Sequence, residues 1–345
     1  MKILVAPMDW GLGHVSRTIP IIKTLLSRGH EIITCGNNDA KTIYEEEFPN
    51  TKHLNFKGYS PKYSRSNNQG LAMIKQSPKF FKLIKEEEEF ANKIAKELKL
   101  DFIISDNRFG FRSKFTTNIF ICHQINIQGP PFLKQMMHVI NNGYVKKFNH
   151  CWIPDIDKEG KLAGKLSKSK LKNCHYIGSL SRFEMPCKKK LNWKYKYVGI
   201  LSGPEPQRSI LERKIISEFK KLKKKCAIIQ GTPNKKNIKM ENIDVFPHLK
   251  TTDFLSIIEN SETIICRSGY SSIMDLSTLQ KQAILIPTPG QTEQNYLAKY
   301  HSKVSNIGYM TQKDITLKEA SKIKGKVNPI SKKELLEKAI IESGL

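Results

Sequence analysis

Short apolar runs alternate with stretches of helical periodicity along the chain, and this alternation limits the fold more than any other feature. Strand-like runs lie at 2–6, 31–35, 102–105, 119–122 and 151–154 in the first half, and at 197–201, 227–229, 263–266 and 283–286 in the second. Strands separated by crossover helices are typical of parallel sheets. Because the pattern stops near the middle and then begins again, we predict an α/β protein with two doubly wound sheets.

The length of the chain also favours two domains, because 345 residues exceed what one hydrophobic core usually serves. We predict a Rossmann-like domain at 1–180, a linker at 181–194 within a lysine-rich stretch, and a second Rossmann-like domain at 195–330. A last helix at 331–345 could pack on either domain. Two such domains facing one another would enclose a cleft.

Composition is that of a soluble globular protein, with 39% hydrophobic residues and no apolar run near the roughly 20 residues that cross a bilayer. The opening MKILVAP is interpreted as a first strand, since Asp9 and the following glycines end it too early for a signal peptide. Seven cysteines without a CxxC pair are typical of reduced core residues. We therefore expect a cytoplasmic protein.

The formal charge of +26 calls for an anionic partner or a solvated surface. Lysines cluster at 161–172, 188–196 and 220–225. Lysine-rich solvated loops, an anionic membrane surface and nucleic acid all stay open. The chain lacks the aromatic–basic interleaving, zinc motifs and helix-turn-helix signature of nucleic-acid-binding proteins, so no specific nucleic acid is expected.

The stretch CRSGYSSIMD, at 266–275, is a candidate anion site in the second half. An apolar run ends there at Arg267, Ser268 and Gly269, and a helical pattern that includes Ser271 follows. Backbone N–H groups at such a helix start point toward one spot and bind anions.

The loop GLGHVSR, at 11–17, is the corresponding candidate in the first half. It lies at the carboxyl edge of the predicted sheet, where ligands bind in open α/β folds. Its glycines do not form GxGxxG, because Ser16 occupies the third position, so NAD is disfavoured. The helix dipole would keep His14 neutral and suited to act as a general base, although His14 could instead simply close the loop.

Acidic residues near these loops could assist the histidine. Asp106 ends a strand that would share the sheet edge with His14, and a carboxylate there could fix the histidine tautomer. Asp9 is nearer in sequence and could do the same. Asp155 and Asp157 form an Asp-x-Asp triplet that binds a metal in other transferases, but we expect solvated acids there and no required metal.

Together, the motifs GLGHVSR, CRSGYSSIMD and TEQNYLA (292–298) resemble those of GT-B glycosyltransferases, which use nucleotide sugars. They are most similar to the family 28 group that includes the lipid II N-acetylglucosaminyltransferase. The pair His14 and Arg17 gives a GHxxR form typical of a less characterised branch. The resemblance implies two Rossmann-like domains, an N-terminal one for the acceptor and a C-terminal one for the nucleotide sugar.

The resemblance also implies roles for individual residues. His14 would lie near the acceptor hydroxyl in a loop formed with Gly11, Gly13 and Arg17. Residues 267–269 would face the donor nucleotide, Asp275 would bind the ribose hydroxyls, and Glu293 with Gln294 would bind the transferred sugar. Arg182 would contact the nucleotide.

One loop departs from the family pattern. The stretch LSGPEPQR, at 201–208, replaces a glycine-rich loop, and Pro204 and Pro206 have no N–H to donate. A phosphate cradle here would depend on Ser202, Gly203 and Arg208.

The predicted activity is transfer, with inversion, of a hexose or N-acetylhexosamine from a UDP-sugar to an acceptor hydroxyl, in cell-envelope glycan or glycolipid synthesis. No cofactor or metal is expected beyond the UDP-sugar co-substrate. A basic amphipathic helix at 131–148 could lie on the inner face of the membrane and admit a lipid-linked acceptor, or pack on the N-terminal sheet. The alternatives are a nucleotide-sugar 2-epimerase, for which Glu205 would have to reach the sugar, a basic nucleic-acid-binding protein, and a nucleotide-sugar-binding protein without turnover.

Overall fold

A computed structural model describes residues 1–9, 11–56, 58, 69–129, 131–183, 194–232, 238–318, 320, 323–330 and 333–345. The chain divides into two compact units. Of the described residues, those within 1–58, 69–181 and 330–345 form unit 1, and those within 182–329 form unit 2. Most of the predicted linker lies outside the described residues.

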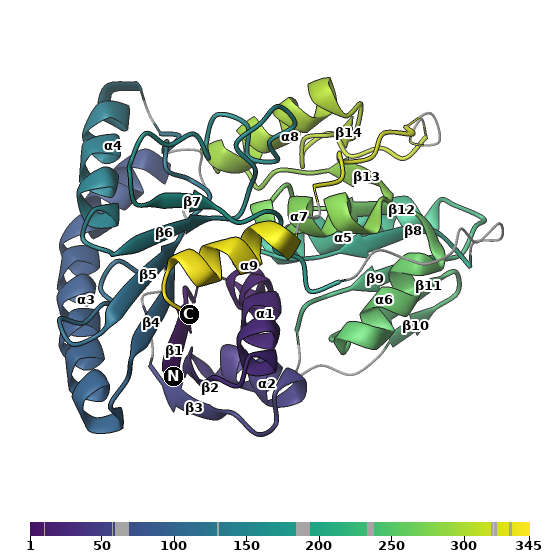
Figure 1. Ribbon diagram of the computed structural model, residues 1–345. Helices are drawn as coiled ribbons and strands as arrows, with labels where there is room; N and C mark the ends of the chain where they lie inside the picture. Colours follow the sequence, from purple (N-terminus) through teal and green to yellow (C-terminus); the bar gives the residue numbers. More distant parts are fainter. Residues whose placement is uncertain are drawn as a thin grey trace. The chain divides into compact units, whose positions relative to one another are not determined.

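Unit 1 is built on a seven-stranded, wholly parallel sheet (Figure 1). In spatial order its strands are β3 (Lys52–Asn55), β2 (Glu31–Gly36), β1 (Lys2–Pro7), β4 (Phe102–Asp106), β5 (Thr117–Ile121), β6 (His150–Ile153) and β7 (Cys174–Tyr176). Its helices are α1 (Leu12–Ser27), α2 (Asn38–Glu47), α3 (Gln69–Leu98), α4 (Pro131–Val145) and α9 (Lys333–Glu342).

Helices cover both faces of the first sheet. Figure 1 shows α3 and α4 along one face and α1 and α2 on the other. Buried Ala91 and Ile94 of α3 pack on Leu4 of β1 and Ile103 of β4. Since strands covered on both faces need continuous apolar runs, the sequences KILVAP and FIISD suit central positions.

The last helix, α9, packs on unit 1. It contacts β7, and Trp152 of β6 donates its indole N–H to Ser343 Oγ at 3.1 Å. Periodicity alone left open which domain the last helix packs on, and these contacts place it on unit 1.

Unit 2 contains a second seven-stranded sheet with the same kind of winding. Its strands, in spatial order, are β10 (Ile238–Met240), β11 (Ile243–Phe246), β9 (Cys226–Ile229), β8 (Tyr195–Ile200), β12 (Ser261–Cys266), β13 (Gln282–Leu285) and β14 (Gly308–Tyr309). Its helices are α5 (Gln207–Lys220), α6 (Thr251–Glu259), α7 (Tyr270–Leu279) and α8 (Thr292–Val304). The short strand β10 is antiparallel, and the other pairings are parallel.

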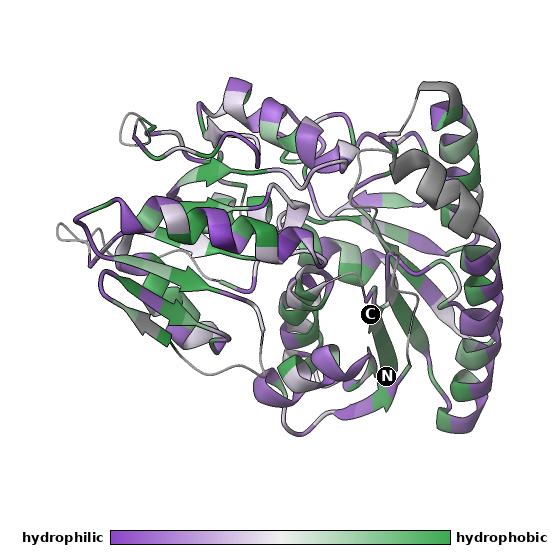
Figure 2. Ribbon diagram, turned by 180° about the vertical axis from the view of Figure 1, so that it is seen from behind, coloured by the Kyte–Doolittle hydropathy of each residue, from purple (hydrophilic) through white to green (hydrophobic). Residues whose placement is uncertain are grey.

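Burial follows the hydropathy pattern in both units. Figure 2 shows largely hydrophobic central strands and helices striped by hydrophilic residues. In unit 2, Leu211, Ile215 and Phe219 of α5 are fully buried in the core that includes Ile228 of β9. Within the described part of the chain, no helix is long and apolar enough to cross a membrane.

Both sheets reverse their winding direction beside their first strand. In unit 1 the chain winds outward from β1 through β2 to β3, and then returns to place β4 on the other side of β1. In unit 2 the corresponding reversal lies between β8 and β12. Because the loops at the carboxyl ends of the two strands diverge there, such a reversal is where ligands bind in open α/β sheets. The predicted α/β fold is confirmed.

Candidate functional site

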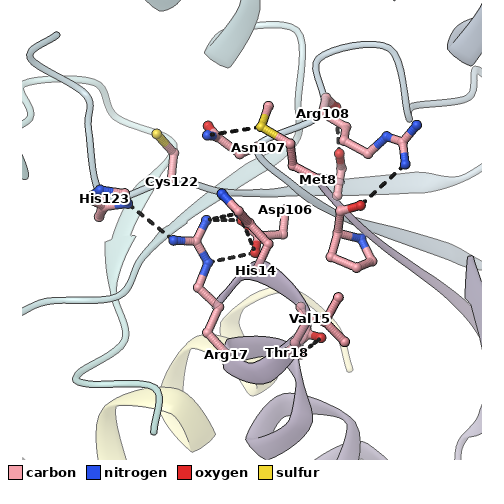
Figure 3. A network of polar contacts seen from close by, with 12 residues as sticks. Met8, His14, Val15, Arg17, Thr18, Asp106, Asn107, Arg108, Cys122 and His123 are labelled. Carbon is pink, nitrogen blue, oxygen red and sulfur yellow. Dashed lines mark hydrogen bonds and ion pairs between the residues drawn. The ribbon is translucent and has the colours of Figure 1, made fainter. Parts of the chain in front are cut away.

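A buried polar network lies at the winding reversal of unit 1 (Figure 3). His14 and Arg17 come from the first turns of α1, and Asp106 is the last residue of β4. Arg17 donates from Nε to Asp106 Oδ2 at 2.6 Å and from Nη2 to Oδ1. His14 Nδ1 lies 3.2 Å from Asp106 Oδ2. The structure therefore brings together the pair that the sequence placed on one sheet edge.

Local sequence explains how these residues converge. Arg17 follows His14 by three residues, so both side chains lie on one face of α1. The backbone of the β1–α1 loop reaches the end of β4, where Met8 N–H donates to the Asp106 carbonyl at 3.0 Å. Gly11 precedes α1 with φ of 111°, a conformation that suits glycine.

The protonation of this network suits a proton acceptor. Burial lowers the pKa of His14, and the neighbouring Arg17 lowers it further, while Asp106 opposes both effects. Burial alone would raise the pKa of Asp106, but Arg17 and His14 hold it at about 2. At neutral pH the network therefore contains a carboxylate, a guanidinium and a neutral imidazole.

Arg17 has a second contact that bears on the histidine tautomer. Its Nη2 lies 2.9 Å from His14 Nδ1, close to the Asp106 oxygen that could accept from the same nitrogen. An Nδ1–H would donate to Asp106, whereas a bare Nδ1 would accept from Arg17. In the first tautomer Nε2 is left as the basic nitrogen of the ring. The side chain of His14 is 17% exposed, which leaves the ring partly accessible.

His123 is a member of the network that sequence analysis missed. It is buried, and its Nδ1 lies 3.3 Å from Arg17 Nη1. It comes two residues after β5, at the same sheet edge as Asp106. The signal was present in the sequence, because a histidine directly after a predicted strand belongs to that edge.

Asp9, the alternative partner for His14, is bound elsewhere. One of its oxygens accepts from the Gly58 N–H at 2.7 Å, and the other lies 3.6 Å from Arg108 Nη1. The contacts of Asp9 therefore favour Asp106 as the partner of His14.

Arg267, at the winding reversal of unit 2, points into the protein. It is 1% exposed, and burial lowers its pKa to about 10, so it stays charged at neutral pH. Its Nη2 donates to the Gln207 carbonyl at 2.9 Å and to Gln312 Oε1, while Nη1 donates to the carbonyls of Ile286 and Pro287. The guanidinium thus ties together three loops at the sheet edge. Contact of Arg267 with a donor phosphate stays a prediction. The sequence analysis did not predict that Arg267 holds the surrounding loops in place.

Ser268 and Gln294 join two loops at the same edge. Ser268 Oγ donates to the Gln294 carbonyl at 2.8 Å, and Gln294 Oε1 accepts from the Thr288 N–H at 2.8 Å. The Thr288 hydroxyl is buried without a hydrogen-bond partner among the described residues. A buried hydroxyl without a partner is costly, so Thr288 is an exception among the polar groups of this loop.

The proline-containing loop at 201–208 leaves Ser202 and Gly203 exposed at the end of β8. Gly203 has φ of 95° and lies beside the Thr288 hydroxyl. Arg208 pairs with Glu205 at 2.7 Å and with Glu212 at 3.1 Å. The oxygens of Glu205 accept from Arg208 and from the backbone and hydroxyl of Ser209, so its contacts lie at the start of α5.

The remaining predicted donor residues lie in unit 2. Asp275 and Ser271 are half-buried on α7, and Glu293 is half-buried at the start of α8. The Arg182 guanidinium lies 4.9 Å from the ring centroids of Phe183 and Phe254. Their assignment to a nucleotide or sugar stays a prediction.

Asp155 differs from the expectation of solvated acids. It is fully buried and accepts from the backbone N–H groups of Leu162 and Ala163 and from the Ser167 hydroxyl. It therefore fixes the loop after β6. Among the described residues no cluster of three metal-binding side chains occurs.

Comparisons with known proteins agree with this architecture. Residues 204–341 match the glycosyltransferase family 28 C-terminal domain. No protein of curated function matches the sequence. The glycosyltransferase SnogD from Streptomyces nogalater superposes with a TM-score of 0.61 at 11% identity, covering 99% of this chain and 93% of that one. MurG from Acinetobacter baumannii gives 0.52 at 12% identity, with 99% and 93% covered.

A third similar structure contains a nucleotide. The spinosyn rhamnosyltransferase SpnG complexed with thymidine diphosphate gives a TM-score of 0.57 at 10% identity, covering 99% of this chain and 91% of that one. The predicted resemblance is confirmed: the chain has the GT-B fold, and its residues 204–341 match the glycosyltransferase family 28 C-terminal domain.

Proposed function

We propose that this protein is an inverting glycosyltransferase that moves a hexose or N-acetylhexosamine from a UDP-sugar to an acceptor hydroxyl. The observation that carries the proposal is the buried network of His14, Arg17 and Asp106 at the winding reversal of unit 1. The family 28 domain in the C-terminal part supports a nucleotide-sugar donor.

In this mechanism His14 is the general base. Its lowered pKa keeps the imidazole neutral at pH 7, and Nε2 takes the proton of the acceptor hydroxyl. The acceptor oxygen forms a bond to the anomeric carbon as the bond from that carbon to the diphosphate breaks. Asp106 stabilises the imidazolium that results.

The leaving diphosphate would bind at the winding reversal of unit 2. The start of α7 provides backbone N–H groups after Gly269, and a helix N-terminus favours negative charge there. Exposed Ser202 and Gly203 follow the neighbouring strand β8. Arg267 would act here as a positioning residue, since its donors hold the surrounding loops. Asp275, Glu293 and Gln294 would bind the ribose and the sugar.

An anionic membrane surface is proposed as a further partner, with a glycan or lipid-linked acceptor. On α4, Met136, Val139 and Ile140 are 53%, 65% and 39% exposed and follow helical spacing. Lys134 lies on the same helix and Lys146 directly follows it, and both are exposed. Exposed apolar side chains beside lysines are typical of helices that lie on anionic lipid.

The donor assignment is tested by thermal shift with UDP, UDP-glucose, UDP-N-acetylglucosamine and thymidine diphosphate. A ligand at 100 times its Kd adds about 2.7 kcal/mol to the free energy of unfolding. We expect stabilisation by the UDP compounds. The absence of a shift with every UDP compound would overturn the donor assignment. A shift with thymidine diphosphate alone would mean that the donor nucleotide carries thymine and not uracil.

The base assignment is tested by His14→Ala, with His30→Ala as a control outside the network. We expect His14→Ala to lower kcat by about 10²- to 10⁴-fold while the thermal shift with UDP survives. The control His30→Ala should keep both the wild-type kcat and the thermal shift with UDP. Unchanged turnover in His14→Ala would refute His14 as the base.

A further inference from the structure

His123 contacts the guanidinium of Arg17 but has no role in the mechanism above. It follows β5 by two residues, whereas Asp106 ends the neighbouring strand β4. Figure 3 shows the guanidinium of Arg17 between His123 on one side and Asp106 on the other. The backbone beside His123 is fixed, because the Cys122 N–H donates to the Trp152 carbonyl at 3.1 Å. His123 therefore contacts Arg17 from a well-anchored strand end.

This contact determines the protonation state of His123. Arg17 Nη1 lies 3.3 Å from His123 Nδ1, and both side chains are buried. A guanidinium nitrogen can only donate, since the group stays protonated in proteins. The hydrogen bond therefore requires a bare Nδ1 on His123, so the ring is neutral and carries its proton on Nε2. A protonated ring would instead place two buried cations side by side, where like charges repel.

The donors of Arg17 are divided among three side chains. Nε and Nη2 bind the two oxygens of Asp106. Nη1 reaches His123, and Nη2 also lies 2.9 Å from His14 Nδ1. Both imidazoles thus contact one guanidinium, each through its Nδ1.

The orientation of the guanidinium bears on whether His14 can act as a base. If Arg17 Nη2 donates to His14 Nδ1, the ring carries its proton on Nε2 and has no free nitrogen for an acceptor hydroxyl. If Asp106 Oδ2, at 3.2 Å, accepts from an Nδ1–H, then Nε2 is free to take a proton. Only the second arrangement suits general base catalysis.

The charge of His123 also bears on His14. Burial is the largest influence that lowers the pKa of His14, Arg17 lowers this pKa further, and charge on His123 lowers it as well. The contact with Arg17 requires a neutral His123, which removes the last of these effects. His14 thereby stays more basic.

From these observations we infer that His123 is a positioning residue that acts through Arg17. By accepting from Nη1, it restrains the guanidinium from turning toward His14 Nδ1, so that the proton on this nitrogen is donated to Asp106 and Nε2 stays basic. The inference rests on the proposed function, because it gives His123 a part in preparing the base.

The test compares His123→Leu with His123→Asn in the full chain. The two new side chains have nearly the same shape, but only asparagine has an oxygen that can accept from Arg17 in place of Nδ1. Turnover is measured as hydrolysis of the UDP-sugar that gives the largest thermal shift, with water as the acceptor. His123→Leu should lower kcat at least about tenfold, which corresponds to about 1.4 kcal/mol, with KM little changed. His123→Asn should recover most of the lost activity.

Nitrogen-15 NMR of histidine-labelled protein reads the tautomers without any substrate. In the wild-type protein at pH 7 we expect the proton of His123 on Nε2 and the proton of His14 on Nδ1. His123→Leu should move the proton of His14 toward Nε2, and His123→Asn should keep it on Nδ1. Signals are assigned from those lost in His14→Ala and His123→Leu. Loss of packing alone would change stability by similar amounts in both variants and would not exchange the protonated nitrogen of His14.

Two results would overturn the inference. One is a proton on Nδ1 of His123 in the wild-type protein, a measurement that needs no variant and therefore decides even if His123→Leu does not fold. The other is the same His14 tautomer in His123→Leu and His123→Asn.

The two proposals fail separately. If His14→Ala keeps full turnover while the tautomers respond to His123 as expected, the base assignment falls and the action of His123 through Arg17 stands. If His14→Ala loses turnover while the two His123 variants share one His14 tautomer, the inference about His123 falls alone.

Discussion

Replacing Arg17 by methionine should strongly destabilise unit 1 at neutral pH. Arg17 bonds both oxygens of Asp106, and the two side chains are 2% and 0% exposed. Methionine keeps the apolar stem but leaves a buried carboxylate with His14 Nδ1 as its remaining side-chain contact among the described residues. Removing one partner of a buried ion pair costs about 3–5 kcal/mol.

The lowered pKa of Asp106 reflects the net stabilisation of its carboxylate by Arg17 and His14 against the effect of burial. Its reduction from 3.8 to about 2 corresponds to about 2.5 kcal/mol of stability, which is present above pH 4 and lost as pH falls through 2. Burial is the largest single influence on this pKa and raises it, so removing Arg17 shifts the pKa of Asp106 upward. The folded variant then binds a proton more readily than the folded wild-type protein. Lowering the pH should therefore reduce the difference between their free energies of unfolding.

Urea unfolding followed by tryptophan fluorescence, to which Trp152 in the core of unit 1 contributes, measures the effect. We expect Arg17→Met to lose about 3–5 kcal/mol at pH 7 and clearly less at pH 3. The double variant Arg17→Met/Asp106→Asn should recover part of the loss, because the buried charge is gone. A loss below about 1 kcal/mol at pH 7, or the same loss at both pH values, would refute the reasoning.

Two further predictions concern unit 2 and α4. Arg267→Met should lower the free energy of unfolding by about 2–4 kcal/mol, because it leaves the Gln312 side chain and the Gln207 carbonyl without their donor; a thermal shift that shows full stability but lost UDP binding would instead point to direct phosphate contact. Val139→Glu should reduce sedimentation with phosphatidylglycerol vesicles several-fold without changing Tm. The control Gln135→Glu adds the same charge outside the set of exposed apolar residues on α4 and should reduce sedimentation less. Equal losses in the two variants would show that charge alone governs the binding.

Central strands could be predicted from sequence because burial on both faces requires a continuous apolar run. The stretches KILVAP and SETIIC show this, and the structure buries nearly every residue of both. Edge strands lack that signal. The strand KHLN of β3 has no buried residue, and β14 has two residues, so neither differs from a loop in sequence.

The helix α2 was missed for a different reason. Its N-cap Asn37 accepts from the Ala40 N–H, which is a recognisable start signal. Only three of its ten residues are buried, and so few apolar positions give too weak a periodicity to predict a helix.

Side-chain direction accounts for most of what sequence could not predict in the candidate site. An arginine directly after a strand can point toward a ligand or into the protein, and spacing does not distinguish the two. Arg267 points inward because backbone carbonyls from two loops and the Gln312 side chain from a third converge on it, and these partners are up to 60 residues away in sequence. Asp155 likewise finds its N–H partners 7 and 8 residues later, in a loop without a recognisable motif. His14 and Asp106 were predictable together because strand order alone brings their loops to one edge.

Under the proposed function, the two winding reversals divide the transfer reaction between the two halves of the chain. Each reversal separates two loops at the carboxyl ends of neighbouring strands, and the identity of those loops sets the chemistry. In unit 1 the loop after β1 and the end of β4 bring a neutral imidazole, a guanidinium and a carboxylate together, a set that can move a proton. In unit 2 the loops after β8 and β12 offer glycines, serines and a helix start, which suit a diphosphate. A base beside a diphosphate would have its imidazolium stabilised by the anion and its pKa raised. Under the proposed function the base and the diphosphate site belong to different sheets, and burial and Arg17 keep the imidazole of His14 neutral until it accepts the proton.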